Sequence, residues 1–340
     1  MRLSRKHLTL IVLAVLIALA PALFPSNFYY RIGALIFVNG LAVTGLVVLI
    51  GFAGQISLGH AGFAGIGAYA CALAPGYLGL HPGLAMLLGA VLSGGLAWLI
   101  GRPILRLKGY YLAVATLGFG ILVSMVLANE AKITGGPDGR EVAELGLRSA
   151  LASIGLALSN AQFWYAATGL SMLAGAWIAL NLQDSPSGRA LRALHDSEIA
   201  ARTVGVDVAQ LKLCAFVISA VYASLSGSLL ALMNRFITPD VAGFLHSVEL
   251  VTMTVFGGVG SVPGAILGAA TLTLLPQALT VLQQYENLIL GLIMMLVMIF
   301  MREGLLPSLM RWKICRFWKV RDRPRSASRL GAMPVTSRPS

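Results

Sequence analysis

Apolar residues fill long stretches of the chain, and the charged residues fall between those stretches. The interval 32–101 contains no Lys, Arg, Asp or Glu over 70 residues. Because a helix of about 20 apolar residues crosses a bilayer, the charge-free intervals divide into ten predicted membrane segments. These segments are approximately 8–24, 31–50, 54–74, 83–101, 110–128, 162–181, 211–233, 247–260, 264–282 and 287–301.

The third predicted segment differs from a simple membrane anchor. It overlaps the interval 51–67, which holds six glycines in 17 residues together with Gln55, Ser57 and His60. Such a density of glycine is typical of helices that pack closely or are interrupted beside a pathway. The eighth and tenth segments are short for a full crossing. We therefore expect an all-α, polytopic integral membrane protein of about ten transmembrane segments, with glycine-rich broken or re-entrant elements.

Composition supports a membrane protein and indicates its orientation. Of the 340 residues, 57% are hydrophobic and 11% are charged, whereas soluble domains average about 25% charged residues. If the N-terminus is cytoplasmic and the chain crosses ten times, 20 of the 25 Lys and Arg residues lie on the cytoplasmic side. The positive-inside rule requires this asymmetry, so both termini are predicted to be cytoplasmic.

The C-terminal region differs from the rest of the chain. We expect a transmembrane domain over 1–310 and a basic, disordered cytoplasmic tail over 311–340. The net charge of +12 could suggest a nucleic-acid-binding protein, but no aromatic stacking platform or folded nucleic-acid-binding motif accompanies the tail. Contact with anionic lipid headgroups of the membrane is the ordinary role of such a tail, and no nucleic acid is expected as a partner.

Two connections between the predicted segments are long. The loop 129–161 is expected on the periplasmic side, and its apolar part, 145–158, is expected to form a short surface helix. The loop 182–211 is expected on the cytoplasmic side. A loop of this length beside a membrane domain is a candidate for contact with a partner protein.

The cytoplasmic loop carries several helix signals. Ser185, followed by a proline, predicts the start of one helix, and Asp196 is expected to cap a second helical turn over 197–203. Gly205 is expected to end that turn, and Asp207 to cap the next membrane helix. The loop is therefore predicted to hold two short helices.

These two helices have two interpretations. They could form an interfacial connector, or they could form a coupling surface that fits a partner's groove. In the second case the apolar side chains offered to the partner are Leu191, Leu194, Ile199 and Ala200. Glu198 and Arg202, four residues apart, are expected to pair on the exposed face.

Five motifs occur in an order that resembles the membrane permease subunits of bacterial branched-chain amino acid ABC importers. They are GQISLGHAGFAGIGAY at 54–69, GYYLAVATLGFG at 109–120, TGGPDG at 134–139, GRALRALHDSEIAA at 188–201 and GGVGSVPG at 257–264. The resemblance covers roughly 28–307. It implies a subunit of the bacterial inner membrane that translocates branched-chain or related small amino acids.

The resemblance also implies partners. These are a second homologous permease subunit, a periplasmic substrate-binding protein, and separate ATP-binding cassette subunits that dock on the cytoplasmic loop. The segment 198–205 is similar to the Glu-Ala-Ala loop of ABC importers, although Ile199 follows the Glu. The residues expected to form the ATPase-coupling loop are Gly188, Arg189, Leu191, Arg192, Leu194, Glu198, Ala200, Ala201 and Gly205.

Ten segments divide into two sets of five, and the odd number in each set makes the second run in the opposite direction. A second glycine-rich stretch, 257–268, falls near the middle of the second set, as 51–67 does in the first. Matching interruptions in inverted halves indicate a pathway between them. The candidate pathway residues are Gln55, Ser57, His60, Gly257, Gly258 and Gly260. The alternative is that these residues only pack helices together, with their hydrogen bonds satisfied.

Other classes of function are less well supported by the sequence. The chain has no Gly-x-x-x-x-Gly-Lys-Ser/Thr motif, so a partner must supply the ATPase, and no enzymatic, metal-binding or cofactor motif is present. An ion-coupled secondary transporter is the alternative of another class. It usually needs buried carboxylates, and only Glu249 is expected near membrane depth. Urea, short amides or other small solutes are alternative substrates within the same family.

Overall fold

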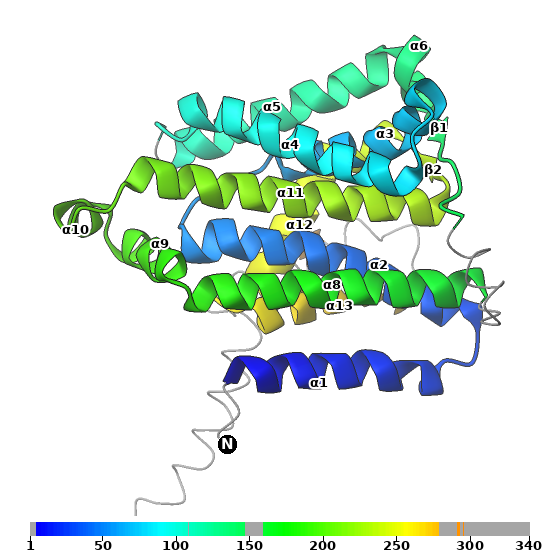
Figure 1. Cartoon of the computed structure of the whole chain (residues 1–340), viewed down its shortest axis with the longest axis horizontal. Coiled ribbons are helices and arrows are strands. Elements are labelled where there is room, and N and C mark those ends of the chain that lie inside the picture. Colours follow the sequence, from blue (N-terminus) through cyan, green and yellow to red (C-terminus); the bar gives the residue numbers. More distant parts are fainter. Residues whose placement is uncertain (1–4, 108, 147–158, 279–290, 293–294, 296–340) are drawn as a thin grey trace, which may run out of the picture.

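The body of the molecule is a bundle of apolar helices. The computed structural model describes residues 5–107, 109–146 and 159–278, together with 291, 292 and 295. Within these residues, six helices are long and apolar enough to cross a membrane. They are α2 (Asn27–Leu46), which continues as the π-helical turn η2 (Val47–Phe52), α3 (His60–Leu78), α4 (Pro82–Ile104), α5 (Tyr110–Asn129), α8 (Asn160–Asp184) and α11 (Val208–Asn234). Figure 1 shows these helices running in similar directions.

Three shorter apolar helices accompany the six long ones. They are α1 (Arg5–Leu19), which ends in the 3-10 turn η1 (Ala20–Leu23), α12 (Phe244–Gly257) and α13 (Val262–Ala278). With 14 residues and a rise of about 1.5 Å per residue, α12 is roughly 21 Å long, which is less than the roughly 30 Å of a hydrocarbon core.

The protein is therefore a polytopic helical membrane protein, as predicted, although fewer than the expected ten or so segments are long enough to cross a membrane within the described residues. The described residues hold six candidate spans and three shorter apolar helices. The tenth predicted segment, 287–301, lies outside the described residues except for three positions.

The third predicted segment begins in the wrong place. A helix was expected from residue 54, but the chain is irregular over 53–59 and α3 begins only at His60. Gly54 has a φ of +66°, in the left-handed region where a helix cannot continue. The glycine-dense interval thus contains a break between two helices, which we call the first break (53–59).

Short elements connect the spans. After α5 come α6 (Ala131–Thr134), η3 (Gly136–Asp138) and β1 (Arg140–Glu141), and after α11 come β2 (Phe236–Ile237) and η4 (Pro239–Ala242). The antiparallel pair of β1 and β2 is the only strand pairing in the described residues, and each strand has two residues, so the fold class is all-α as predicted. The surface helix expected over 145–158 lies outside the described residues after position 146. Between α8 and α11 lie α9 (Pro186–Asp196) and α10 (Glu198–Thr203).

Helices α2, α3 and α11 form the core of the bundle, because α2 and α3 both pack against α11. Gly67 of α3 faces the Ser224 carbonyl, and Gly227 of α11 faces the Ala64 carbonyl, so closely that a Cβ would clash at either position. Small residues allow helix backbones to approach in this way in a membrane. The helices α3 and α11 consequently cross in close backbone contact beside the candidate site.

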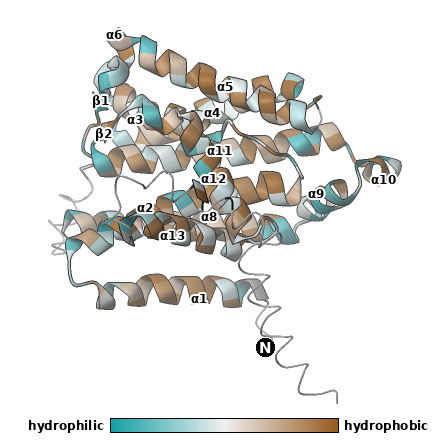
Figure 2. Cartoon of the chain, turned by 180° about the vertical axis from the view of Figure 1, so that it is seen from behind, coloured by the Kyte–Doolittle hydropathy of each residue, from teal (hydrophilic) through white to brown (hydrophobic). Residues whose placement is uncertain are grey.

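Apolar side chains also cover the outside of the bundle. Figure 2 shows hydrophobic residues along the outward sides of α1 and α5. Exposed apolar side chains on α4 and α5 include Leu84, Leu87, Val91, Leu99, Ile121, Leu122 and Met125. A bilayer covers such surfaces with its acyl chains.

The described Lys and Arg residues gather at one end of the bundle. In Figure 1 this end holds α9, α10, the start of α1 and the end of α4, and we call it the basic end. Its cationic residues with described side chains are Arg102, Arg106, Arg189, Arg192, Arg202 and Lys212. The opposite end carries Arg31, Lys132, Arg140 and Arg235. The described residues thus keep the charge asymmetry expected of a membrane protein.

Candidate translocation and coupling site

His60 lies at the centre of a buried hydrogen-bond network. It is the first residue of α3 and is completely buried. Its Nδ1 lies 2.8 Å from the Ser57 hydroxyl, and its Nε2 lies 2.7 Å from the Ser219 hydroxyl of α11. A neutral imidazole has one donor and one acceptor nitrogen, so one serine donates and the other accepts. The ring therefore ties the first break to α11.

Gln55 lies in the same break but outside this network. Its side-chain amide donates to the Ala53 carbonyl at 3.2 Å, and the side chain is partly exposed. The structure thus brings Ser57 and His60 together and leaves Gln55 apart. It also adds Ser219, which is 159 residues from His60 in the chain. No signal in the sequence distinguishes Ser219 from the other serines of α11.

The second glycine-rich stretch forms a tight turn between α12 and α13. Gly258 has a φ of +114° and ends α12. The backbones of Gly257 and Gly264 touch, and the Ser261 hydroxyl accepts a hydrogen bond from the Gly264 N–H at 3.2 Å. Around Gly260 there is open space. We call the turn 258–261 the second break.

The two breaks lie close to each other. Gly51 of η2, just before the first break, packs against the Val259 carbonyl so closely that a Cβ at position 51 would clash with it. Farther along the same helices, the Asn39 amide donates to the Thr273 hydroxyl at 3.0 Å and joins α2 to α13. Two stretches separated by about 200 residues in sequence therefore form one glycine-rich region in space.

Helix α9 is anchored to the rest of the chain. Leu191 and Leu194 are 2% and 4% exposed and belong to the chain's own hydrophobic core. The expectation that they face a partner is wrong, because this apolar face is already covered. The His195 ring lies against Gly54, with Nδ1 3.0 Å from where a Cβ would stand. Helix α9 therefore rests directly on the first break.

Polar contacts fix α9 to the end of α8. The guanidinium of Arg189 donates to the Asp184 carbonyl at 2.9 Å, and that of Arg192 donates to the Gln183 carbonyl at 2.8 Å. These carbonyls belong to the last turn of α8, and the last carbonyls of a helix are commonly bound by side chains. Gly188 packs against the Leu182 carbonyl, which leaves no room for a Cβ. Three of the residues predicted for the coupling loop thus hold α9 on α8.

Helix α10 begins one residue later than predicted. Ser197, not Asp196, is its N-cap, and the Ser197 hydroxyl accepts a hydrogen bond from the Ala200 N–H at 3.3 Å. Glu198 pairs with Arg202 at 2.7 Å, as predicted, and also with Lys212 of α11 at 3.0 Å. The Lys212 side chain is only 7% exposed. Glu198 thus joins α10 to the start of α11.

The outer side of α10 is apolar and exposed. Ile199 is 79% exposed and Val204 is 82% exposed, while Ala201 is buried against the core. Ala200, between them in sequence, is exposed. Gly205, with a φ of +85°, ends the turn as predicted. We call Ile199, Ala200 and Val204 the α10 surface. Val204 was not among the residues predicted for the coupling loop. Its position just before Gly205, which ends the helix, could have identified it as an exposed apolar residue.

Ionisable clusters are sparse in the described part of the chain. Within 5–107, 109–146 and 159–278, no group of three or more His, Cys, Asp or Glu residues could hold a metal ion. Glu249 of α12 pairs with His246 at 3.4 Å, and its side chain is 46% exposed. The acidic residue expected near membrane depth is therefore a partly exposed member of an i, i+3 pair.

Comparison with known proteins gives the family. Residues 29–298 match the family model described as branched-chain amino acid transport system / permease component. The chain is 35% identical over 281 residues to the high-affinity branched-chain amino acid transport system permease protein LivM of Salmonella typhimurium, and equally to LivM of Escherichia coli. Each match covers 77% of this chain and 66% of LivM. The chain thus spans slightly less than two thirds of the length of these relatives.

A second relative is matched over nearly its whole length. The permease protein LivH of Escherichia coli is 27% identical over 289 residues, which are 78% of this chain and 90% of LivH. No solved structure matches the chain. The family match includes both glycine-rich breaks, α9 and α10. The chain belongs to the family of branched-chain amino acid transport system permease components.

Proposed function

We propose that this chain is the membrane-spanning permease subunit of an ABC importer in the bacterial inner membrane. It translocates branched-chain or related small amino acids, and separate ATP-binding subunits drive it. The observation that carries this proposal is a continuous line of contacts. It runs from the exposed α10 surface through α9 to the first break, and from there to the second break.

The ATP-binding subunits dock on the α10 surface. Ile199 and Val204 are large apolar side chains that project into solvent at the basic end. A short helix that inserts such side chains into a groove is a common way to join two proteins. The ion pair of Glu198 with Lys212 holds α10 on α11, so a displacement of α10 is transmitted to the bundle.

Movement then reaches the two breaks through α9. His195 is packed on Gly54, and Gly51 is packed on Val259, so α9 contacts the first break and the first break contacts the second. Irregular backbone at membrane depth is tolerated where it lines a cavity or is buried in protein. The two breaks are therefore the elements that change shape during transport. Gln55, Ser57, His60, Gly257, Gly258 and Gly260 are the proposed residues of this pathway.

A second homologous permease subunit completes the pathway, and a periplasmic substrate-binding protein delivers the solute to the end opposite α10. This orientation, with the basic end in the cytoplasm, rests on the gathering of Lys and Arg residues there. We propose that both termini are cytoplasmic and that α12 and α13 form a broken or re-entrant pair. The transmembrane domain spans 1–310; the basic tail, 311–340, lies outside the described residues.

Two alternatives make different predictions. A permease for urea, short amides or other small solutes would share the same architecture and differ only in the solute. An ion-coupled secondary transporter would need neither an ATPase nor an α10 surface. The exposed apolar side chains of α10 favour an importer with docked ATP-binding subunits over that transporter.

Uptake into vesicles tests the proposal. The chain is reconstituted with the second permease subunit and the ATP-binding subunits, ATP is enclosed on the side of α10, and the binding protein is added on the other side. Uptake of labelled leucine, isoleucine, valine and urea is then compared. We expect accumulation of the three branched-chain amino acids. Accumulation of urea alone would favour the first alternative, and equal uptake without ATP would contradict the proposal.

A further inference from the structure

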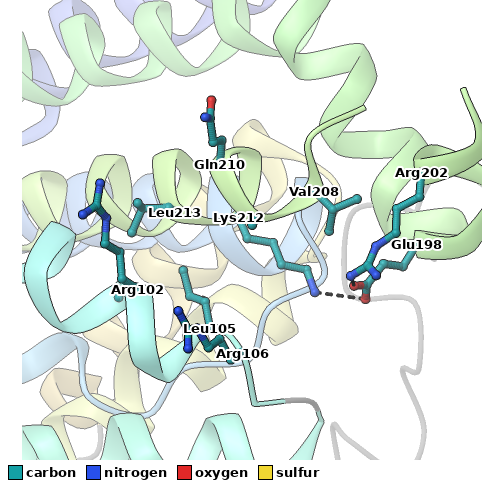
Figure 3. A pocket seen from close by; sticks show the side chains of 11 residues that line it. Arg102, Leu105, Arg106, Glu198, Arg202, Val208, Gln210, Lys212 and Leu213 are labelled. Atoms are coloured by element: carbon teal, nitrogen blue, oxygen red, sulfur yellow. Dashed lines mark hydrogen bonds and ion pairs between the residues drawn. The ribbon is translucent and has the colours of Figure 1, made fainter. Parts of the chain in front are cut away.

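A positively charged cavity opens at the basic end of the bundle. It has a volume of about 560 Å³ and lies between the last turn of α4, helix α10 and the first turn of α11. Figure 3 shows Arg102 of α4, Arg106 just after the end of α4, Lys212 of α11 and Arg202 of α10 around it. Among the described residues that line it, Glu198 is the one carboxylate. Two of the four cationic side chains, Arg202 and Lys212, pair with it.

Among the described residues that line the cavity, cationic side chains outnumber carboxylates by four to one. Glu198 is engaged by Arg202 at 2.7 Å and by Lys212 at 3.0 Å, so one carboxylate offsets the charge of one of these two cations. Arg102 and Arg106 lie on the α4 side, away from this carboxylate in Figure 3. Guanidinium groups bind phosphate oxygens through two parallel hydrogen bonds. The cavity therefore has the charge and the donor groups for a phosphate.

Its position in the bundle favours a lipid as the source of that phosphate. The cavity lies where α4 ends and α11 begins, which is the depth at which lipid headgroups meet a membrane protein. The Arg102 guanidinium lies 3.8 Å from the ring centre of Trp98, and tryptophan is typical of this interfacial layer. Leu99, one turn before the cavity, is 63% exposed. A headgroup in the cavity could extend its acyl chains along this outer face of α4.

We propose that this cavity binds the phosphate of an anionic phospholipid headgroup. Arg102 and Arg106 hold the phosphate from the α4 side, and Lys212 and Arg202 hold it from the other side. The bound lipid bridges α4 to α10 and links the position of the α10 surface to the lipid composition of the membrane. This inference depends on the membrane orientation of the bundle and not on the solute that is transported.

Retention of lipid by the purified full chain tests the proposal. The protein is equilibrated with mixtures of phosphatidylglycerol and phosphatidylcholine, washed in detergent, and analysed by native mass spectrometry. We expect the unchanged protein to retain phosphatidylglycerol in preference to phosphatidylcholine. The R102Q/R106Q variant should retain phosphatidylglycerol about 30-fold less well, because each cation near a membrane surface contributes roughly a factor of five.

Two double variants serve as controls. The R102K/R106K variant keeps both charges and should keep most of the retention. The R189Q/R192Q variant removes two cations from the same end but outside the cavity, so its retention should be unchanged. If R102Q/R106Q does not fold, R202Q replaces a side chain that is 62% exposed and should lower retention about fivefold.

The competing outcomes are distinct. Equal retention by R102Q/R106Q and the unchanged protein would overturn the proposal, as would equal binding of phosphatidylcholine. Displacement of the lipid by millimolar inorganic phosphate would assign the cavity to a soluble phosphate rather than to a lipid. An equal loss in R189Q/R192Q would mean that general surface charge, and not this cavity, holds the lipid.

Discussion

Replacing Ile199 and Val204 together by alanine should weaken the docking of the ATP-binding subunits. Both side chains are exposed in the described chain, so removing their methyl groups takes no packing away from the permease itself. Alanine also has a higher helix propensity than isoleucine or valine, so α10 should stay folded. Any loss of affinity would then arise from contacts with the partner.

The size of the effect can be worked from the exposed fractions. Isoleucine to alanine removes three CH₂ equivalents and valine to alanine removes two, each worth about 0.8 kcal/mol on burial. Scaled by the exposed fractions of 79% and 82%, the losses are about 1.9 kcal/mol at Ile199 and about 1.3 kcal/mol at Val204. Together they correspond to a Kd about 200-fold higher, since about 1.4 kcal/mol is a factor of ten. This value is an upper bound, because it takes both side chains to be fully buried on docking.

Titration of the ATP-binding subunits onto permease held in nanodiscs would measure this Kd. The control is Ile133→Ala, which removes a 49% exposed isoleucine from α6, at the end opposite α10. Its Kd should stay within a factor of two of the unchanged protein. If the double alanine variant also binds within a factor of two, the α10 surface is not the docking site.

Two further predictions concern the helix packing around the candidate site. Ser219→Ala should lower the free energy of unfolding by about 1–2 kcal/mol, because it leaves the buried His60 Nε2 without its partner. Denaturant unfolding in micelles measures this change. The control is Ser93→Ala, which removes a buried hydroxyl with no partner among the described residues and should leave the free energy of unfolding unchanged. Gly227→Leu should abolish a monodisperse gel-filtration peak, because the side chain would meet the α3 backbone. Gly95→Leu, where no atom lies within 4 Å, should keep that peak, and equal behaviour of the two variants would refute the tight crossing.

The boundaries of the long helices were predictable where charge and capping residues agree. Charge-free intervals of about 20 residues located the main spans, and Asp207 was identified as the N-cap of α11. Its carboxylate accepts a hydrogen bond from the Gln210 N–H at 3.1 Å. Short apolar intervals were less informative. The eighth predicted segment, 247–260, was short for a full crossing, and α12 has 14 residues, but its bounds are three residues earlier, at Phe244–Gly257.

The cap of α10 illustrates a limit of sequence patterns. Asp196 and Ser197 are both good N-cap residues, and their order in the sequence does not decide between them. In the structure Asp196 is still in the last turn of α9, while Ser197 has an extended backbone with a φ of −159°. The choice depends on where the preceding helix ends, which the local sequence does not specify.

Burial of the α9 leucines shows a second limit. The spacing of Leu191 and Leu194 indicates an apolar face that must be covered, but not what covers it. The structure assigns that face to the chain's own core. The sequence pattern does not predict long-range polar partners either, since the hydrogen bond between His60 and Ser219 joins residues 159 positions apart. Tertiary packing thus decides which predicted residues are anchors and which are exposed.

The source of energy for uptake is the most direct test of the proposed function. Vesicles holding the reconstituted complex are given either ATP or a non-hydrolysable analogue on the side of α10, with and without ionophores that collapse ion gradients. We predict that leucine accumulates only with ATP and that ionophores leave the rate unchanged. Accumulation that survives removal of the ATP-binding subunits, but stops when the ion gradient collapses, would contradict the proposal and identify a secondary transporter.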